Sequence, residues 1–209
     1  MTERLYYTSD ALTGHAQVIN VTPDEEGRYM IELDKTLFHP QGGGQPADRG
    51  QIAGITVEGV VQRDDRIVHL LAEPLATGEV EMRVDATTRL QHARLHSAGH
   101  LIGLAGEQCG WRPVKAHHWP GEGKITFAAS GHAAQPEVSM LLTLIHQWLA
   151  DDLPRHISCE DGLRMVSFGD LLAYPCGGTH VANLAAVGEV EITQIKVKKG
   201  QLLVSYTLA

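Results

Sequence analysis

The chain has 209 residues, of which 43% are hydrophobic and 20% charged, and its formal net charge is −8. This composition is typical of a globular protein with a large core, arranged as one large domain or two small ones. No apolar run is long enough to span a bilayer, and the first residues lack the features of a signal peptide, so we expect a cytoplasmic protein. The acidic balance argues against a protein held to nucleic acid by overall charge, and three cysteines argue against a disulfide framework.

The N-terminal part of the sequence predicts β-structure. Short segments rich in valine and isoleucine are separated by Gly, Pro or Asp, which favours a small barrel. These segments are 15–21, 28–33, 50–61, 66–71 and 78–84. Between the second and the third lies TLFHPQGGGQPADRG, whose consecutive glycines predict a loop with unusual backbone geometry.

The pattern becomes helical after residue 84. Residues 85–88 offer helix N-caps, and a helix is expected from Arg89 to about Gly106. A second helix is expected from Glu137 to about Asp151, after a proline favoured at the first helical position. The tail predicts a β-hairpin with a glycine-containing turn. We therefore expect an α+β protein with a β-barrel-like domain over 1–86, which carries the glycine-rich loop, and an α+β domain with an antiparallel sheet over 87–209.

Two histidines on the first helix, His96 and His100, are spaced for metal binding. Residues four apart share a helix face, where two neutral imidazoles can hold one zinc ion. Apolar residues such as Leu101 point away from them, so we expect the histidines to line a surface or a cleft. Chance alone gives roughly 0.7 such pairs in a chain of this composition, so the pair by itself is weak.

A second pair, Cys176 and His180, strengthens the metal prediction. Chance gives roughly 0.2 pairs of this kind, and the intervening glycines let a tight loop wrap around an ion. One pair on a helix and one on a loop together predict a tetrahedral zinc site. Hydrogen-bonded histidines without a metal remain the alternative. Ser97 stands where a zinc protease carries its glutamate base, which argues against that class.

These motifs resemble a known family. HSAGHLI and PCGGTHVANLAAVGEVEI resemble the editing domain of alanyl-tRNA synthetase and its free-standing relatives, the AlaX proteins. The segments LDKTLFHPQGGGQPADRG, KAHHWPGEGKITF and ITQIKVKKGQLLVSYTL agree with the same family, in the same order, from about Asp34 to the end. A departure is His39, where the family often has tyrosine, and three further histidines are added candidate ligands or bases: His92, His117 and His118.

The resemblance implies a trans-editing hydrolase. Its substrate would be tRNA for alanine that wrongly carries serine or glycine, and no membrane partner is expected. It implies that residues 87–209 form a zinc-binding editing domain. The implied zinc ligands are His96, His100, Cys176 and His180. It also implies that Thr36 and Gln45 lie near the substrate and affect which amino acid is hydrolysed.

Several roles stay open on chemical grounds. The backbone N–H groups of Gly43 and Gly44 suit an oxyanion or the terminal phosphate, although a plain tight turn is the alternative. Thr36 and Gln45 suit the serine hydroxyl, since a site built for a hydroxyl disfavours substrates without one. Three roles of zinc stay open: activating water or the carbonyl, binding the substrate amino group, and holding the loop in place. A non-catalytic zinc-stabilised RNA-binding module and a metal hydrolase of another aminoacyl ester are the competing functions.

Local charge predicts where RNA would bind despite the acidic balance. We expect contacts from the basic stretch between Arg89 and Lys124 and from a lysine cluster at 196–199.

We also expect Cys109 and Cys159 to be buried structural thiols.

Overall fold

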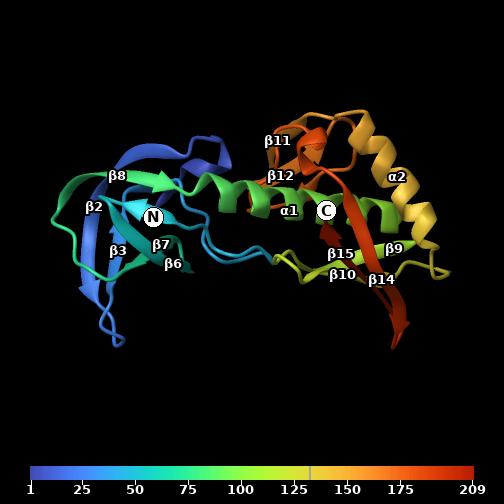
Figure 1. Cartoon of the computed structure of the whole chain (residues 1–209), viewed down its shortest axis with the longest axis horizontal. Coiled ribbons are helices and arrows are strands. Elements are labelled where there is room, and N and C mark those ends of the chain that lie inside the picture. The colour runs from blue at the N-terminus through green and yellow to red at the C-terminus, as the bar shows by residue number, and fades with distance from the viewer. Residues whose placement is uncertain (132) are drawn as a thin grey trace. The chain divides into compact units, whose positions relative to one another are not determined.

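The computed structural model describes residues 1–131 and 133–209, and the chain divides into two compact units. The first unit comprises residues 1–42 and 46–90, and the second comprises residues 43–45 and 91–209. The division falls inside helix α1 (Ala86–Gln108), whereas the sequence suggested a boundary after residue 86 (Figure 1). Gly43, Gly44 and Gln45 belong to the second unit, so the glycine-rich loop, expected wholly in the first domain, is divided between the units.

The first unit is built on six strands that close into a barrel in the order β2-β3-β7-β6-β5-β8, with antiparallel pairs. The strands are β2 (Thr13–Pro23), β3 (Tyr29–Leu33), β5 (Gly50–Ile52), β6 (Ile55–Arg63), β7 (Arg66–Leu71) and β8 (Gly78–Val84). The predicted segment 50–61 is two strands, because Ala53 and Gly54 form a tight turn with φ values of 51° and 79°. A short parallel pair, β1 (Glu3–Arg4) and β4 (Lys35–Thr36), and the 3-10 helix η1 (Leu5–Tyr7) complete the unit.

The second unit contains a four-stranded antiparallel sheet, in the order β14-β15-β10-β9, and a three-stranded sheet, β11-β12-β13. The strands are β9 (Trp111–His117), β10 (Gly123–Ala129), β11 (Arg155–Glu160), β12 (Leu163–Phe168), β13 (Tyr174–Pro175), β14 (Val190–Lys198) and β15 (Gln201–Leu208). Helix α2 (Val138–Ala150) and the 3-10 helix η2 (Leu184–Val187) complete it. The α+β class is therefore confirmed, and the expected terminal hairpin is β14–β15.

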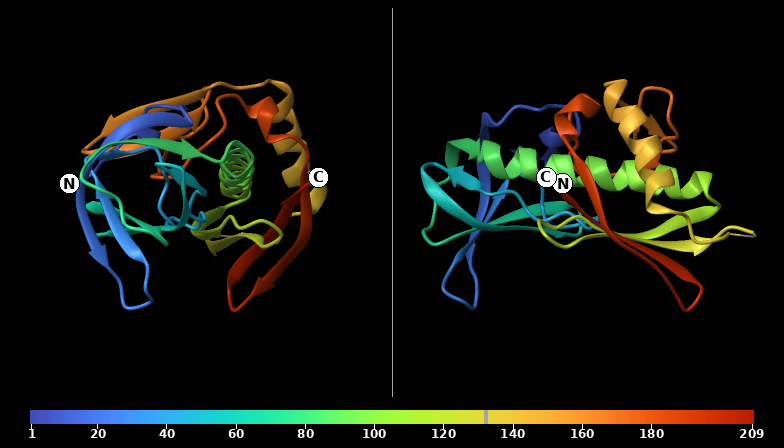
Figure 2. Two further views of the ribbon diagram at one scale, coloured as in Figure 1. Left: turned by 60° about the vertical axis from the view of Figure 1, so that its left-hand side comes forward. Right: turned by 45° about the vertical axis from the view of Figure 1, so that its right-hand side comes forward.

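From Gln91 onward, helix α1 belongs to the second unit, where it lies beside the four-stranded sheet and α2 (Figure 2). Its buried residues share one core with side chains of the sheet, α2 and β12. An added Cβ would lie 3.0 Å from the Tyr206 hydroxyl at Gly99 and 2.9 Å from Phe127 Cζ at Gly106, so these glycines permit close packing on the helix. His92 to Gly106 is consequently buried, apart from two half-buried residues, and the histidine face is covered as well. The histidines were expected to line a surface or a cleft, and the structure covers their face while leaving His100 half-buried.

Two smaller expectations also change. Helix α2 begins at Val138 with Glu137 as its N-cap, so the preceding proline lies outside the helix. Cys109 is half-buried, with its Sγ 3.5 Å from Met140 Sδ, but Cys159 is exposed. The expectation of a buried Cys159 is wrong because β11 is the outer strand of its sheet and lies largely in solvent. Among the described residues, no helix combines the length and apolarity needed to cross a membrane.

Candidate metal centre

The four predicted ligands lie together in the second unit. His96 and His100 come from α1, and Cys176 and His180 come from the loop that begins directly after β13. Their ligand atoms all lie within 4.8 Å of one another. Cys176 Sγ is 3.5 Å from His96 Nε2 and 3.2 Å from His180 Nε2. Zinc bonds of about 2.0–2.3 Å in a tetrahedron place neighbouring ligand atoms about 3.3–3.6 Å apart, and the two distances from Cys176 Sγ lie close to this range.

The ionisation of these side chains also suits a metal. Burial, with a contribution from the positive charge of Arg164, lowers the pKa of His100 to about 4. Burial, His100 and Arg164 hold the pKa of His180 well below its usual value, so both imidazoles are neutral near pH 7. Burial raises the pKa of the Cys176 thiol, opposed by the Gly178 N–H group and by Arg164. Because metals bind the thiolate, zinc uptake near neutral pH is expected to release a proton.

Gln45 fixes the orientation of a ligand histidine. Its Oε1 accepts the backbone N–H of Thr179 at 3.0 Å and lies 2.7 Å from His96 Nδ1. A backbone N–H can only donate, so this atom of the side chain is the amide oxygen, and His96 must donate its Nδ1 proton to it. The other ring nitrogen of His96, Nε2, is then unprotonated and faces the Cys176 sulfur. Such outer partners hold metal-binding histidines in the correct tautomer.

The side chain of Gln45 is fully buried, and its amide nitrogen donates to Thr179 Oγ1 at 2.9 Å. The neighbouring Gly178 leaves room for this arrangement: a Cβ there would lie 2.8 Å from Gln45 Oε1 and would also strike the His96 ring. Gly44 has a φ of 81° and accepts the His118 N–H at 2.8 Å, which ties the glycine-rich loop to the end of β9. Gly43 also has a positive φ, of 59°.

Ser97 contacts His180, another histidine of the cluster. Its Oγ lies 3.1 Å from His180 Nδ1 and accepts the Val181 N–H at 3.2 Å. With a metal on His180 Nε2, Nδ1 carries the proton and donates to Ser97. The residue that replaces a protease's glutamate therefore orients a ligand in this chain.

The extra histidines separate into distinct positions. The His118 ring stacks on His96 at 4.3 Å, and its Nδ1 lies 2.7 Å from Tyr206 Oη, which donates to the Leu95 carbonyl. Burial lowers the pKa of His118 to about 3, assisted by His100 and His117. His117 stacks instead on a tryptophan near the β9–β10 turn. Among the described residues, the metal cluster has four members and excludes the buried His92.

Two arginines that the sequence did not single out hold the loop that carries Cys176 and His180. Arg164 Nη1 donates to the carbonyls of Cys176 at 2.7 Å and Gly178 at 3.1 Å, and Arg155 Nη1 donates to the His180 carbonyl at 2.7 Å. Both come from the β11–β12 hairpin. An arginine in a strand carries no local sign of such a role, because its carbonyl partners lie in a different segment.

Thr36 lies on β4 in the first unit and is fully buried. His69 Nδ1 lies 3.1 Å from the Ile31 carbonyl, to which it must donate, so its Nε2 accepts the Thr36 hydroxyl proton at 2.8 Å. Thr36 Oγ1 also accepts the Phe38 N–H at 3.0 Å. One lone pair of the hydroxyl oxygen remains.

Arg89, expected among the RNA contacts, is instead buried in the first unit. It pairs with Asp48 and donates to the Leu37 carbonyl at 2.6 Å. Its charge is neutralised within the protein, so the expectation that it contacts RNA is wrong.

Comparison with known proteins finds relatives that match most of the chain. Residues 163–202 match the family model described as the threonyl and alanyl tRNA synthetase second additional domain. The chain is 29% identical over 201 residues to the alanyl-tRNA editing protein AlaX-M of Pyrococcus horikoshii, covering 91% of this chain and 90% of that protein. It is also 29% identical to alanyl-tRNA editing protein Aarsd1 of Bos taurus and to an alanine–tRNA ligase of Halorubrum lacusprofundi, covering 85% and 91% of this chain.

The chain spans 45% of the Aarsd1 protein and 24% of the ligase, so it matches only a part of each. Residues 163–202 are therefore similar to the second additional domain of threonyl- and alanyl-tRNA synthetases. Over most of its length the chain is similar to the alanyl-tRNA editing protein AlaX-M, as the sequence motifs predict.

Proposed function

We propose that this protein is an aminoacyl-tRNA hydrolase that removes wrongly attached serine, and also glycine, from tRNA for alanine, with zinc as its cofactor. The observation that carries the proposal is that Gln45 of the glycine-rich loop lies in the same unit as the four-residue cluster, where it contacts both His96 and Thr179. The editing relatives that span most of the chain support the same activity. Since its substrate is used in translation, we place the activity in the cytoplasm.

The physical need for editing comes from the size of the amino acids. Serine and glycine differ from alanine by too little for a pocket to reject them strongly, so a second hydrolytic site supplies fidelity. When bound, zinc supplies Lewis-acid chemistry that polarises a carbonyl or lowers the pKa of water. Gln45 and Ser97 hold the ligands in position, while Arg155 and Arg164 hold the loop. We assign the backbone N–H groups of Gly43 and Gly44 to the oxyanion or the terminal phosphate.

Thr36 and Gln45 remain our candidates for selectivity. The Thr36 hydroxyl donates to His69, so its contribution to recognising serine would be to accept the substrate hydroxyl with its remaining lone pair. Thr36→Ser keeps the hydroxyl and is the matched control for Thr36→Val. Selectivity predicts that Thr36→Val slows release of serine more than release of glycine, whereas equal losses would limit Thr36 to a structural role.

The four protein ligands also support a second candidate function. A site closed by four protein side chains is typical of structural zinc, and a zinc-stabilised RNA-binding module would leave the ester intact. A hydrolase of other aminoacyl esters is the third possibility.

The test is deacylation of Ser-, Gly- and Ala-tRNA for alanine, before and after zinc removal. We expect rapid loss of serine, retention of alanine, and an activity that chelation abolishes and added zinc restores. Binding of tRNA without acceleration of ester loss would establish the non-catalytic module. Hydrolysis of a small aminoacyl ester that carries no RNA, at the same rate as Ser-tRNA, would establish the third function.

A further inference from the structure

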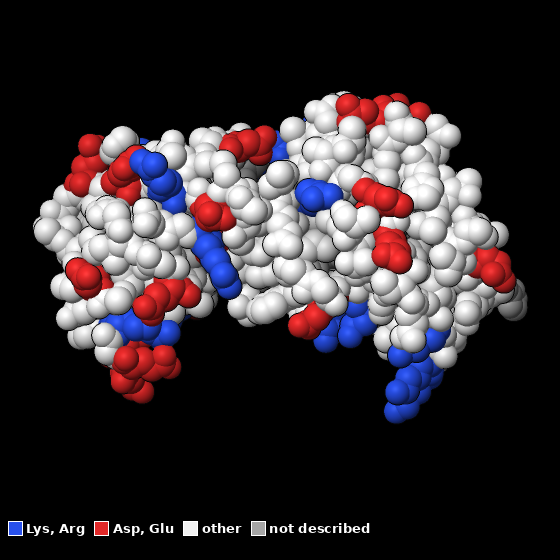
Figure 3. Space-filling model, viewed as in Figure 1, with Lys and Arg blue, Asp and Glu red and all other residues white. Residues whose placement is uncertain are grey.

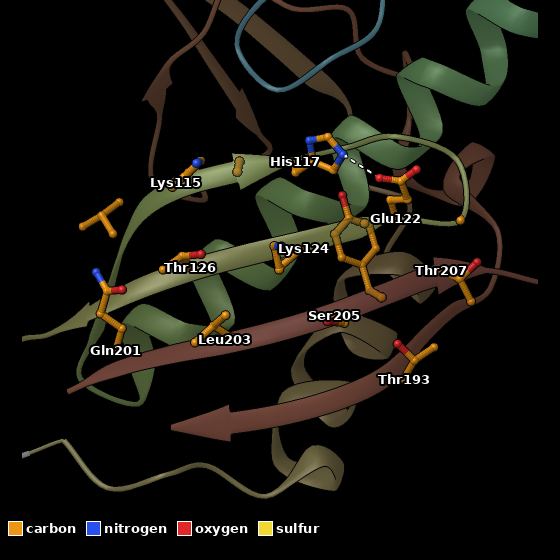
Figure 4. A pocket seen from close by; sticks show the side chains of 15 residues that line it. Lys115, His117, Glu122, Lys124, Thr126, Thr193, Gln201, Leu203, Ser205 and Thr207 are labelled. Atoms are coloured by element: carbon orange, nitrogen blue, oxygen red, sulfur yellow. Dashed lines mark hydrogen bonds and ion pairs between the residues drawn. The ribbon is translucent and has the colours of Figure 1, made fainter. Parts of the chain in front are cut away.

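The four-stranded sheet of the second unit has one covered face and one open face. Alternate residues of β10 and β15, including Phe127, Leu202 and Val204, are fully buried and pack in the core with α1. Side chains in a strand alternate between faces, so the residues between them point outward. A groove of about 670 Å³ lies on this outer face, and its lining includes Lys115, Lys124 and Ser205 (Figure 4).

Strand register gathers cations on this outer face. Directly opposite residues share a face, and Lys196 on β14, Leu203 on β15, Thr126 on β10 and Lys115 on β9 form one row across the sheet. A second row has Lys198 at one edge and Arg112 at the other. A third row runs from Gln194 through Ser205 and Lys124 to His117. Rows two residues apart along a strand are separated by about 7 Å, so the charges are spread over the face.

The face is positive although the chain is acidic. Five exposed cations belong to it: Arg112, Lys115, Lys124, Lys196 and Lys198. Glu191 is the acidic residue of the strand rows, and Glu122 lies at the rim of the groove. In the part of the chain that the structure describes, none of the five forms an ion pair with a carboxylate, unlike Arg28, Arg66 or Arg89. Blue atoms at the free end of the β14–β15 hairpin are visible in Figure 3.

We infer that this outer face, which we call the cationic sheet face, binds the phosphate backbone of RNA. Phosphates are recognised by exposed Lys and Arg together with hydroxyl and amide donors, and the rows contain both kinds of group. The stacked pair of His117 and Trp119 beside the groove, with ring centroids 5.6 Å apart, adds an aromatic surface that suits RNA over other polyanions. The inference rests on the proposed function for the identity of the RNA, namely tRNA for alanine.

The experiment measures binding of uncharged tRNA for alanine across a range of salt concentrations. The two variants are Lys196→Gln with Lys198→Gln, and Lys115→Gln with Lys124→Gln. The control is Arg49→Gln with Arg63→Gln, which removes two exposed charges from the first unit and lowers the net charge equally. Thermal melting and zinc content verify that each variant is folded.

Removal of one lysine–phosphate interaction should reduce the slope of log affinity against log salt by about one. The fall in affinity between 50 and 200 mM salt should then shrink by about 3.5-fold for each such interaction. The control should keep the wild-type slope. An equal effect in the control would show that net charge alone acts, and unchanged binding in both sheet variants would overturn the inference.

Two further results separate the inference from the proposed function. Wild-type protein that deacylates Ser-tRNA while the sheet variants bind tRNA normally would refute the face and leave the function intact. Protein that binds tRNA through the face but never accelerates deacylation would refute the function alone. Variants that lose heparin binding but keep tRNA binding would assign the face to another polyanion, against the inference.

Discussion

The orientation of His96 by Gln45 makes a specific prediction about zinc affinity. Gln45→Leu keeps the size of the buried side chain and removes the acceptor of the His96 Nδ1 proton. With zinc on Nε2, that proton must remain on Nδ1, now buried without an acceptor, which costs about 1–3 kcal/mol. Without zinc, the ring is free to adopt the other tautomer, so this cost falls on zinc binding. We expect zinc affinity to fall by about 10- to 100-fold.

Gln45→Leu also removes the acceptor of the Thr179 N–H group. This loss is the same with and without zinc, so it lowers the folding stability and leaves the zinc affinity unchanged. Gln45→Glu is the matched control, since a carboxylate still accepts from both His96 and Thr179. We expect this variant to bind zinc within a few-fold of wild type.

The assay is competition for zinc against a chromophoric chelator, with circular dichroism to verify folding. Wild-type zinc affinity in Gln45→Leu would refute the orienting role. If such a variant also lost activity on Ser-tRNA, Gln45 would act on the substrate, as the sequence motif first suggested.

Three further predictions concern stability and are checked by urea unfolding. Thr36→Val should lower the free energy of unfolding by about 1–3 kcal/mol, because it leaves the buried Nε2 of His69 without its donor, whereas Thr36→Ser should change it less. Burial lowers the pKa of His69 from 6.5 to about 4, so between these values the unfolded chain binds the proton and the folded chain does not. The free energy of unfolding should therefore fall by about 2 kcal/mol from pH 7 to pH 5 because of His69. His69→Gln should remove this part of the pH dependence, and a variant with the wild-type pH dependence would contradict the prediction. Gly103→Ala should stabilise α1 by up to about 1 kcal/mol, since its Cβ would meet atoms no closer than 3.7 Å. Gly106→Ala should instead destabilise by about 1–2 kcal/mol, because its Cβ would lie 2.9 Å from Phe127 Cζ, and equal effects at the two glycines would contradict this packing.

Local chemistry made much of the molecule predictable. Strands rich in β-branched residues, the helix of His96 and His100, and the final hairpin are all encoded by short-range periodicity. The four candidate metal ligands could also be selected from the sequence, because each pair satisfies a four-residue spacing within its own segment. The structure brings the two pairs together, with Cys176 Sγ 3.5 Å from His96 Nε2.

Strands β9–β12 were not predicted from the sequence, and the exposed Cys159 was misjudged with them. Their pairing depends on partners that lie far along the chain, and strand formation follows such partners more than local preference.

The sequence alone determined which side chains are able to hold a metal, since ligand type and spacing are local properties. Only the tertiary structure decided what surrounds them. It buries Arg89 against Asp48, places Arg164 on a carbonyl of the loop that carries Cys176 and His180, and sets Gln45 on His96. It also gathers lysines from three strands on one face of an acidic protein. Hydrogen bonds and charge fields act over distances of a few ångströms in space, and residues far apart in the sequence come that close only when the chain has folded.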